Sequence, residues 1–358
     1  MSKMILAINP GSTSTKIAIF RDTEKQYQKS IDHDIATLEK FNYATEQTDF
    51  RKELVLNTVK ESGYDISDFS AVVSRGSSGL NSLEHGGYLI NEDMVKQLLE
   101  TPQMDHASNV GPLVAKAIAD AIGVNSYIYD AVVTDELTDI TRMTGLPMFK
   151  RICRFHALNS RAMAYKVAAE TGQDLYESNY IVCHMGGGIS ASLFINGRAV
   201  DYMDDDEMAF SPERAGQLPQ KQLIDLCFSG KYTHREIMKM CKGNGGVKAH
   251  LGTADMREVD KMIENGDGKA KQIVAGMIYR IAKAIGGLAT GANGKIDAIV
   301  LTGGIAYDNY VIDALIPRIE FIAPVHVKPG ENEMEALAEG THRIINENET
   351  VREYVFAK

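Results

Sequence analysis

The chain has 358 residues, of which 44% are hydrophobic and 24% are charged, and its formal net charge at pH 7 is −10. This length exceeds the size at which a single hydrophobic core usually stops growing, so we expect two domains. The acidic balance excludes a broad nucleic-acid-binding surface, because no excess of Lys and Arg exists to neutralise phosphates, but it permits a nucleotide ligand.

In chain order, the first half predicts three strands followed by alternating helices and strands. Its predicted elements are two strands within Met4–Phe20, a strand near Tyr27–Asp34, a helix over Asp49–Ser62, a strand over Phe69–Val73, a helix over Ser108–Ile122 and a strand over Ser126–Val133. Gly63 and Gly123 stand where glycine commonly follows the end of a helix.

The second half repeats that order. Its predicted elements are strands over Tyr180–Met185, Ala191–Ile195 and Arg198–Met203, a helix over Ala270–Ala289 and a buried strand over Ala298–Leu301. Asn196-Gly197 is the strongest short hairpin signal in the chain. We therefore expect an α/β protein of two duplicated βββαβα domains that face each other across a cleft, with a hinge at a helix or helix end near 134–160.

Glycine-rich turns follow apolar strands in both halves. The first is Gly11-Ser12-Thr13-Ser14, the second is Gly186-Gly187-Gly188, and Gly303-Gly304 follows the strand 298–301. Backbone N–H groups in such turns form anion sites, and consecutive glycines allow a ligand to approach the backbone closely. These turns favour nucleotide phosphate binding, although plain hairpin geometry explains any one of them alone. None matches a P-loop or a GxGxxG turn that opens a helix.

Four charged or polar residues are candidates for a site. Arg75 and Asp130 directly follow apolar strands, at the sheet edge where α/β proteins bind ligands. Arg214 lies in a loop of turn-forming residues, and His156 begins an amphipathic stretch. Local pairing, helix capping or solvation explains each of them about as well when it is considered singly.

Two acidic runs have a simpler explanation than a metal site. The run 204–207 consists of adjacent carboxylates that repel one another, so we expect a solvated loop. Glu331, Glu333 and Glu335 precede an apolar-periodic stretch, where acids usually complement a helix dipole. The four cysteines, Cys153, Cys183, Cys227 and Cys241, lack CxxC spacing and indicate small buried side chains rather than a zinc site or disulfides.

Targeting signals are also absent from the pattern of the sequence. The N-terminus has no basic region followed by an apolar core, and we find no apolar run long enough to span a membrane. We therefore expect a cytoplasmic protein that contacts neither membranes nor nucleic acid.

Taken together, these residues resemble the acetokinase family of the actin-like, sugar-kinase and Hsp70 superfamily, and within it the butyrate kinases. The resemblance spans nearly the whole chain in the expected order. The matching segments are Ala7–Lys16, His106–Asn109, Asp135–Leu137, Phe155–Asn159, His184–Ser190, Phe210–Gly216, Leu226–Tyr232, Leu251–Thr253, Leu301–Ala306 and Glu333–Ala338.

The resemblance implies two actin-like (RNase H-like) domains around a nucleotide cleft. The acyl-substrate side would comprise residues 1–135 and about 340–358, and the nucleotide-binding domain residues 136–339. The implied reaction is reversible: ATP and a short-chain carboxylate such as butyrate give an acyl phosphate and ADP by direct in-line transfer. It also implies Mg²⁺ as a cofactor and a homo-oligomer, a dimer or larger.

Roles for the candidate residues follow from the same resemblance. Arg75 and Arg214 would bind the carboxylate and the equatorial oxygens of the transferring phosphoryl group, and His156 would donate a hydrogen bond to it. Asn9 would orient the γ-phosphate, while Asp130 and Glu333 would position Mg²⁺. The implied nucleotide-binding residues are Gly11, Ser12, Thr13, Ser14, Lys16, His184, Gly186, Gly187, Gly188, Gly303, Gly304 and Ile305.

Two segments depart from the pattern of butyrate kinases. Residues 74–80 replace a Gly-Arg-Gly-Gly type sequence, and residues 205–209 replace a loop that is richer in Gly and Pro. Both are expected near the acyl substrate, so a preference for acetate, propionate or a branched acid such as isobutyrate stays open. A nucleotide-dependent sensor of the same fold is the alternative from another class, but it leaves Arg75, His156 and Arg214 without a purpose.

Overall fold

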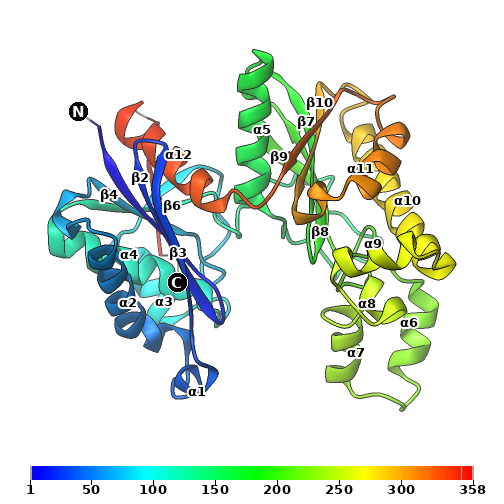
Figure 1. Cartoon of the computed structure of the whole chain (residues 1–358), viewed down its shortest axis with the longest axis horizontal. Helices are drawn as coiled ribbons and strands as arrows, with labels where there is room; N and C mark the ends of the chain where they lie inside the picture. Colours follow the sequence, from blue (N-terminus) through cyan, green and yellow to red (C-terminus); the bar gives the residue numbers. More distant parts are fainter. Residues whose placement is uncertain (1, 348, 357–358) are drawn as a thin grey trace. The chain divides into compact units, whose positions relative to one another are not determined.

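The computed structural model describes residues 2–347 and 349–356, and the chain divides into two compact units (Figure 1). The first comprises Met1–Asp135 and Asn332–Lys358, and the second comprises Glu136–Glu331. The chain returns to the first unit at Asn332, earlier than the position near 340 that we expected.

The first unit is built on one seven-stranded sheet with the order β12-β5-β6-β4-β1-β2-β3. Its strands are β1 (Met4–Pro10), β2 (Ser14–Arg21), β3 (Glu24–Asp32), β4 (Ala71–Arg75), β5 (Gly87–Leu89), β6 (Asn125–Tyr129) and β12 (Arg352–Glu353). The first three strands are antiparallel neighbours, whereas β4 runs parallel to both β1 and β6. Parallel pairing places the ends of β1, β4 and β6 at one edge of the sheet.

The second unit repeats this order in a five-stranded sheet, β11-β10-β7-β8-β9. Its strands are β7 (Asn179–Met185), β8 (Ile189–Ile195), β9 (Arg198–Met203), β10 (Ala298–Gly303) and β11 (Val325–Pro329). The order β6-β4-β1-β2-β3 of the first unit corresponds strand by strand to this sheet. The expected duplication of βββαβα units is therefore confirmed.

Helices α2 (Thr48–Glu61), α4 (Val110–Ile122) and α12 (Glu333–Asn346) pack on the first sheet. The unit also contains α1 (Ile35–Leu38) and α3 (Glu92–Glu100). Leu6 and Ile8 of β1 share a hydrophobic core with Val55 of α2 and Val114 of α4. Because side chains alternate along a strand, the opposite face of β1 is the one that α12 contacts.

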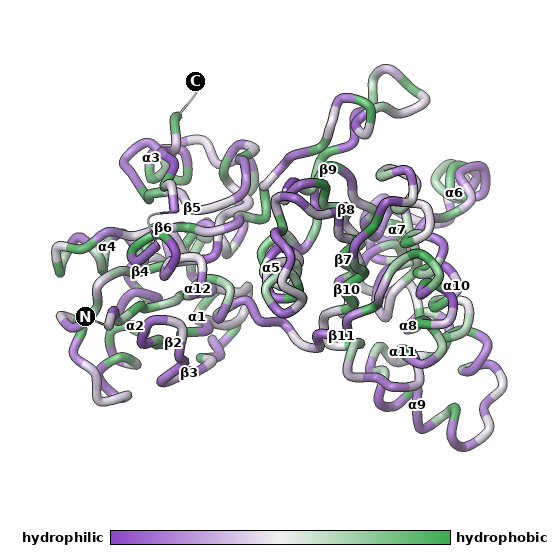
Figure 2. The backbone as a smooth tube through the Cα atoms, turned by 90° about the horizontal axis from the view of Figure 1, so that it is seen from above, coloured by the Kyte–Doolittle hydropathy of each residue, from purple (hydrophilic) through white to green (hydrophobic). Residues whose placement is uncertain are grey.

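The second sheet lies between α5 (Ala157–Thr171) and α10 (Gly268–Gly291). The remaining helices of this unit are α6 (Gln220–Cys227), α7 (His234–Cys241), α8 (Gly246–Leu251), α9 (Met256–Glu264) and α11 (Asn309–Leu315). Cys183 and Met185 of β7 share a core with α10, which leaves His184 on the face toward α5. Figure 2 shows the apolar character of the buried strands β7 and β8.

One described helix, α10, is long and apolar enough to cross a membrane by length and composition alone, although we expected no such run. Nine of its residues are buried, and they pack in the core of the second unit. A core helix therefore accounts for its composition.

The segment 136–156 contains no helix, and α5 begins at Ala157, so a helix end does lie within the range 134–160 where we expect the hinge. The change of unit at Asp135 falls in irregular chain, and the first helix after it begins at Ala157. Gly145 and Pro147 interrupt any helical run within the segment, because proline also disfavours helix in the residue before it.

Candidate active site

The first glycine-rich turn joins β1 to β2 and is held from behind by a side chain that sequence reasoning missed. Arg51 of α2, which is 1% exposed, donates to the carbonyl oxygens of Gly11 at 2.9 Å and Ser14 at 3.0 Å. It also contacts the Ser12 carbonyl and the Thr15 hydroxyl. Burial lowers the pKa of Arg51 to about 10, so the guanidinium is charged at neutral pH.

Asn9, Arg75 and Glu333 come together beside this turn, from three distant parts of the chain. Asn9 Nδ2 donates to Glu333 Oε2 at 2.6 Å, and Arg75 Nη1 lies 3.2 Å from Glu333 Oε1. Lys16 is the cross-strand partner of Asn9, so the two side chains leave the same face of the sheet. Strands β1, β2 and β4 and the start of α12 thus bring an amide, two cations and a carboxylate together.

Asp130 directly follows β6 and has a φ of 41°, in the left-handed region that a non-glycine residue rarely adopts. Its carboxylate is buried and accepts a hydrogen bond from Gly86 N at 2.8 Å. Backbone strain of this kind often accompanies a functional position. Among the described residues, no group of three or more His, Cys, Asp or Glu side chains has metal-binding geometry.

Residues 74–80, which depart from the pattern of butyrate kinases, are held in place by contacts that the sequence did not indicate. Ser77 donates to Asn109 Oδ1 at 2.6 Å, and a Cβ added to Gly79 would lie 2.8 Å from the same oxygen. A Cβ on Gly76 would meet Ala131 at 2.2 Å. The glycines here permit close packing, so the segment that carries Arg75 has a defined shape.

The second turn, Gly186–Gly188, is closed by a hydrogen bond from Gly186 N to the Gly188 carbonyl at 2.9 Å. The loop 211–214 is attached to it, because Ser211 Oγ donates to the Gly187 carbonyl at 2.6 Å. Glu213 N donates to the same carbonyl at 3.2 Å. Arg214 is therefore positioned relative to the turn by contacts of the two residues Ser211 and Glu213 that precede it.

Arg214 pairs with a carboxylate from the acidic run. Its Nε lies 3.2 Å from Asp205 Oδ2, and burial raises the pKa of Asp205 while the Arg214 charge opposes that rise. Glu207 and Asp206 also pair with bases, namely Arg151 and Lys242. The expectation that 204–207 is a solvated loop holds for the exposed Asp206, whereas Asp204, Asp205 and Glu207 are half-buried, and Asp205 and Glu207 turn toward different cations.

Gly303 and Gly304, the third glycine-rich segment, lie beside the second turn at the end of β10. Gly303 has a φ of 89°, and a Cβ there would lie 2.4 Å from the Met185 carbonyl, so only glycine fits beside the end of β7. A cavity of about 410 Å³ is lined by both glycine-rich segments, among them Gly186, Gly187, Gly304 and Ile305. A larger cavity, of about 710 Å³, is bounded by residues 205–207 and 216–220. We consider the smaller cavity the better candidate for a phosphate site, because glycines line it, although the other cavity has the larger volume.

His156 precedes α5, and its ring stacks on that of His184 with centroids 3.9 Å apart. His156 Nδ1 lies 2.8 Å from Ser190 Oγ, while His184 Nδ1 lies 2.9 Å from Asn159 Nδ2. Neither Ser190 nor Asn159 was singled out from the sequence beyond its family motif. Each of the two histidines therefore has a buried polar partner in this unit.

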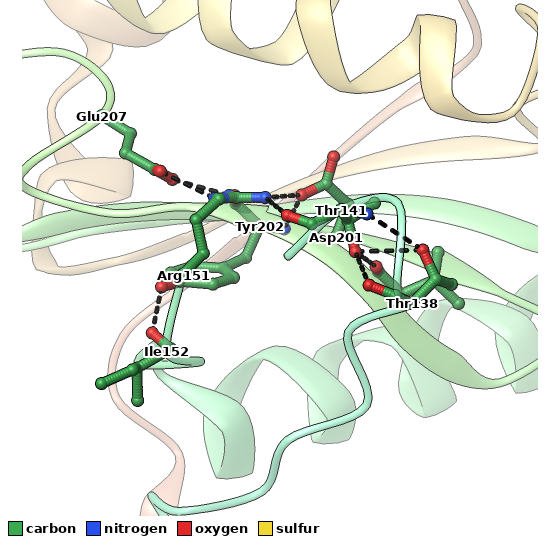
Figure 3. Close-up of polar contacts among 8 residues, drawn as sticks. Thr138, Thr141, Arg151, Ile152, Asp201, Tyr202 and Glu207 are labelled. Atoms are coloured by element: carbon green, nitrogen blue, oxygen red, sulfur yellow. Dashed lines mark hydrogen bonds and ion pairs between the residues drawn. The ribbon is translucent and has the colours of Figure 1, made fainter. Parts of the chain in front are cut away.

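Arg151 fastens the segment that leads into His156 to strand β9 (Figure 3). Its guanidinium binds Glu207 through Nε at 2.7 Å and Nη2 at 2.6 Å, and Asp201 through Nη1 at 2.8 Å. Burial alone would lower the pKa of Arg151, but the bonds to Glu207 and Asp201 outweigh this effect and raise it. The Tyr202 hydroxyl donates to the Ile152 carbonyl, which adds a second attachment.

The candidate residues thus form two groups, one in each unit. The first unit brings together Asn9, Lys16, Arg75, Glu333 and the turn Gly11–Ser14, with Asp130 at the neighbouring strand end. The second brings together His156, His184, Arg214, Gly186–Gly188 and Gly303–Ile305. Two of the four cysteines, Cys153 and Cys183, are buried as expected, whereas Cys227 is exposed and Cys241 half-buried; all four are free thiols.

Known proteins resemble this chain over its full length. Butyrate kinase 2 of Clostridium acetobutylicum is 44% identical over 356 residues, which is 99% of this chain and 100% of that protein. The probable butyrate kinase 2 of Caldanaerobacter subterraneus subsp. tengcongensis is 42% identical over 351 residues, or 98% and 99% of the two chains.

Solved structures agree on the fold. The acetate kinase of Porphyromonas gingivalis superimposes with a TM-score of 0.78 at 18% identity and covers 96% of this chain and 100% of its own. The acetate kinase of Entamoeba histolytica has a TM-score of 0.75 at 17% identity, with the same coverage. The actin-like fold that the resemblance implies is therefore confirmed.

The model of the acetokinase family matches residues 149–356, more than half of the chain. With the full-length relatives, this match confirms the resemblance seen in the sequence motifs: the chain belongs to the acetokinase family.

Proposed function

We propose that this chain catalyses reversible transfer of the γ-phosphoryl group of ATP to the carboxylate of a short-chain fatty acid, with butyrate as the preferred acid. The products are the acyl phosphate and ADP. The observation that carries the proposal is the cluster of Asn9, Arg75 and Glu333 beside the first glycine-rich turn. Full-length relatives named butyrate kinase support the choice of acid.

The chemistry sets a clear demand on these residues. A carboxylate is a weak, anionic nucleophile that must approach a phosphoryl group of the same charge sign. Catalysis must therefore come from charge neutralisation and in-line positioning. Arg75 and Arg214 each present a planar fork of donors that suits the carboxylate and the equatorial phosphoryl oxygens.

The turns divide the remaining work. Asn9 orients the γ-phosphate at the turn Gly11–Ser14, with Lys16 on the same face of the sheet. Gly186–Gly188 cradles the β-phosphate, and Gly303–Ile305 borders the adenosine in the cavity of about 410 Å³. His156 donates a hydrogen bond to the charge that develops on the transferring group.

The donors Asp130 and Glu333 fit Mg²⁺, which prefers one or two carboxylates and retains several waters. Each carboxylate has a partner already, since Asp130 binds Gly86 N and Glu333 binds Asn9 and Arg75. When bound, Mg²⁺ neutralises the charge of the phosphates. Asn9 and Arg75 hold the Glu333 carboxylate in a fixed orientation for that purpose.

The same proposal places the enzyme in the cytoplasm as a homo-oligomer. Four free thiols suit a reducing compartment. The segment that ends at Ile152 exposes an unusual number of large apolar side chains, which supports a protein contact there. These are Ile140, Met143, Leu146, Met148, Phe149 and Ile152.

The test is formation of acyl hydroxamate with Mg-ATP across acetate, propionate, butyrate, isobutyrate and valerate. Maximal kcat/KM with butyrate is the expected result. A maximum with isobutyrate or propionate would move the substrate to that acid and point to the departures at 74–80 and 205–209. Tight ATP binding with no product from any acid would favour a nucleotide-dependent sensor instead.

A further inference from the structure

Arg75 and Glu333 bind each other in the first unit, although the proposed function gives each of them a different task. Arg75 ends β4 and Glu333 begins α12, and Arg75 Nη1 lies 3.2 Å from Glu333 Oε1 and 3.4 Å from Oε2. Among the residues that the structure describes, Glu333 is the only acid that contacts the Arg75 guanidinium. The side chain proposed to bind the acyl carboxylate thus already carries a carboxylate.

The two partners of Glu333 hold it with unequal strength. Asn9 Nδ2 donates to Glu333 Oε2 at 2.6 Å, and Asn9 is 6% exposed. The Arg75 side chain is 32% exposed, and its one hydrogen bond to Glu333 is 3.4 Å long, unlike the short bidentate pairing in which arginine binds a carboxylate most strongly. Ion pairs that water can reach add little stability. Arg75 can therefore leave Glu333 while Asn9 retains it.

The charge of Glu333 opposes the binding of a second carboxylate to Arg75. Two anions that share one guanidinium repel each other, and this repulsion is appreciable in a site that is only partly hydrated. A divalent cation on Glu333 reverses the effect, because it offsets the carboxylate charge and repels the neighbouring guanidinium. The cation that Glu333 binds therefore determines whether Arg75 is available to an acid substrate.

The backbone on both sides of this ion pair is fixed, so an exchange of partners needs only side-chain movement. Strand β4 lies between β1 and β6, and a Cβ added to Gly76 would lie 2.2 Å from the Ala131 side chain. Helix α12 contacts β1 and β4. In the same first turn of α12, Glu335 binds Lys25 of β3 at 2.8 Å, which leaves Arg75 to Glu333.

We propose that Arg75 and Glu333 form an autoinhibitory ion pair that couples the acid site to Mg²⁺: Arg75 stays occupied until Glu333 binds Mg²⁺, and only then binds the carboxylate of the acid at full strength. The inference rests on the proposed function, in which Glu333 holds Mg²⁺ and Arg75 binds the acid. Asn9 keeps Glu333 in place throughout, since its hydrogen bond does not involve Arg75. The pair thus disfavours a complex in which the acid is bound but no magnesium nucleotide is present to react with it.

Equilibrium binding of butyrate to the full chain tests the coupling without turnover, because ADP and butyrate do not react with each other. Isothermal titration calorimetry compares saturating ADP with Mg²⁺ and saturating ADP with EDTA. We expect Mg²⁺ to lower the Kd of butyrate by about 5-fold or more, as for other coupled sites. With Mn²⁺ in place of Mg²⁺, electron paramagnetic resonance should show that butyrate raises the affinity for the metal by the same factor that the metal raises the affinity for butyrate.

Glu333→Gln is the decisive variant, because it removes the charge and preserves the size of the side chain. Without a divalent metal, it should bind butyrate about 5-fold more tightly than the unsubstituted protein does, and Mg²⁺ should add nothing. A misfolded variant cannot produce such a gain. Glu335→Gln is the matched control in the same helical turn, at an acid that pairs with Lys25. It should leave the Kd of butyrate and its dependence on Mg²⁺ unchanged.

Two results overturn the proposal: a Kd of butyrate that Mg²⁺ leaves unchanged in the unsubstituted protein, or a folded, metal-free Glu333→Gln variant that binds butyrate no more tightly. In the second case the ion pair only fastens α12 to β4. The first result decides the question even if Glu333→Gln does not fold. A protein that binds butyrate with the expected dependence on Mg²⁺ but phosphorylates no acid contradicts the proposed function instead, so the two failures are distinguishable.

Discussion

Arg51 Nη1 donates to the carbonyl oxygen of Gly11 at 2.9 Å, from a helix that begins 37 residues after Gly11 in the sequence. The guanidinium donates hydrogen bonds to the carbonyl oxygens of three turn residues, Gly11, Ser12 and Ser14. A cation buried behind the turn fixes its shape and adds a positive potential there, which suits the phosphate binding that we propose for the turn. Arg51 thus links the stability of the first unit to its binding chemistry.

Replacing Arg51 with Met is expected to lower the free energy of unfolding by about 2–4 kcal/mol, because several buried acceptors lose their donor at once. The KM for ATP should also rise, since the turn is no longer held in shape. Urea denaturation and steady-state kinetics measure the two effects. Lys60→Met on the same helix is the control, because Lys60 is exposed. Equal effects of the two substitutions would contradict the role of Arg51.

His33, which lies beside Thr15 in the same region, is expected to make the stability of the folded chain depend on pH. Burial and then the nearby charge of Arg51 lower the pKa of His33, whose Nε2 lies 2.9 Å from Thr15 Oγ1. Below the ordinary value near 6.5, the unfolded chain binds this proton more readily than the folded chain, so stability falls as the pH decreases.

The expected result is that His33→Gln makes the free energy of unfolding less dependent on pH between 7 and 5. Denaturant titrations at several pH values measure this slope. His234→Gln, at an exposed histidine of α7, is the control. A slope that His33→Gln leaves unchanged would mean that other groups cause the acid sensitivity.

Much of the fold could be predicted because the strands carry a local signal. Apolar strands separated by glycine-rich or Asn-Gly turns specify hairpins, and Asn196 and Gly197 indeed both have positive φ. The short strands β5 and β12 were missed, since two or three residues carry no periodicity and pair only through tertiary contacts. The segment 136–156 has no periodicity either, because it contains no helix and is held partly by side-chain contacts such as those of Arg151.

The site divides in the same way. Strand ends and glycine-rich turns pointed from sequence alone to Arg75, Asp130 and the segments that we propose to bind phosphate. Asn159 and Thr302 form a contact across 143 residues, and nothing local marks either as a partner of the other. Asp205 looked solvated because a run of acids has no visible counter-ions in sequence. The cations that separate those acids come from other loops.

Gly246 offers a test of how the loop that carries Arg214 is held. Gly246 and Gly230 have similar positive φ values, 62° and 70°, but only a Cβ on Gly246 would collide, at 1.8 Å from the Ser211 carbonyl. Gly230→Ala should therefore cost about 1–2 kcal/mol of stability from backbone strain alone. Gly246→Ala should cost more and also lower kcat, because the loop 211–214 must shift. Thermal unfolding and steady-state kinetics of the two variants measure these effects. An equal loss of stability in both variants would contradict the collision at Gly246.

Arg151 is expected to hold the segment before His156 against β9. Arg151→Met leaves Asp201 and Glu207 without their cation, which should cost about 2–3 kcal/mol given that both carboxylates are partly exposed. Residues 138–152 should then become sensitive to proteases, as limited proteolysis followed by mass spectrometry would show. Arg154→Met in the same segment is the control, since Arg154 is exposed. Cleavage at the same rate in both variants would show that the backbone alone orders the segment.

Arg75 and Arg214 are expected to neutralise the negative charge of the reacting groups. Replacing either one should therefore lower kcat. Arg75→Ala and Arg214→Ala should each lower kcat by about 10³-fold or more, by analogy with other arginines that stabilise phosphoryl transfer. Lysine at either position should recover only part of the loss, because a point charge cannot reproduce a planar fork. Hydroxamate assays measure kcat, and Arg21→Ala and Arg235→Ala, at exposed arginines of β2 and α7, control for loss of charge.

The two substitutions also differ in the carboxylate that each one leaves without a cation. Without Arg75, Glu333 keeps Asn9 as a partner, whereas without Arg214 the half-buried Asp205 loses the cation that opposes the rise in its pKa. Arg214→Ala should therefore be rescued in stability, but not in kcat, by a second change of Asp205→Asn. If the double variant regained kcat as well, Arg214 would serve only to neutralise Asp205 and would have no part in phosphoryl transfer.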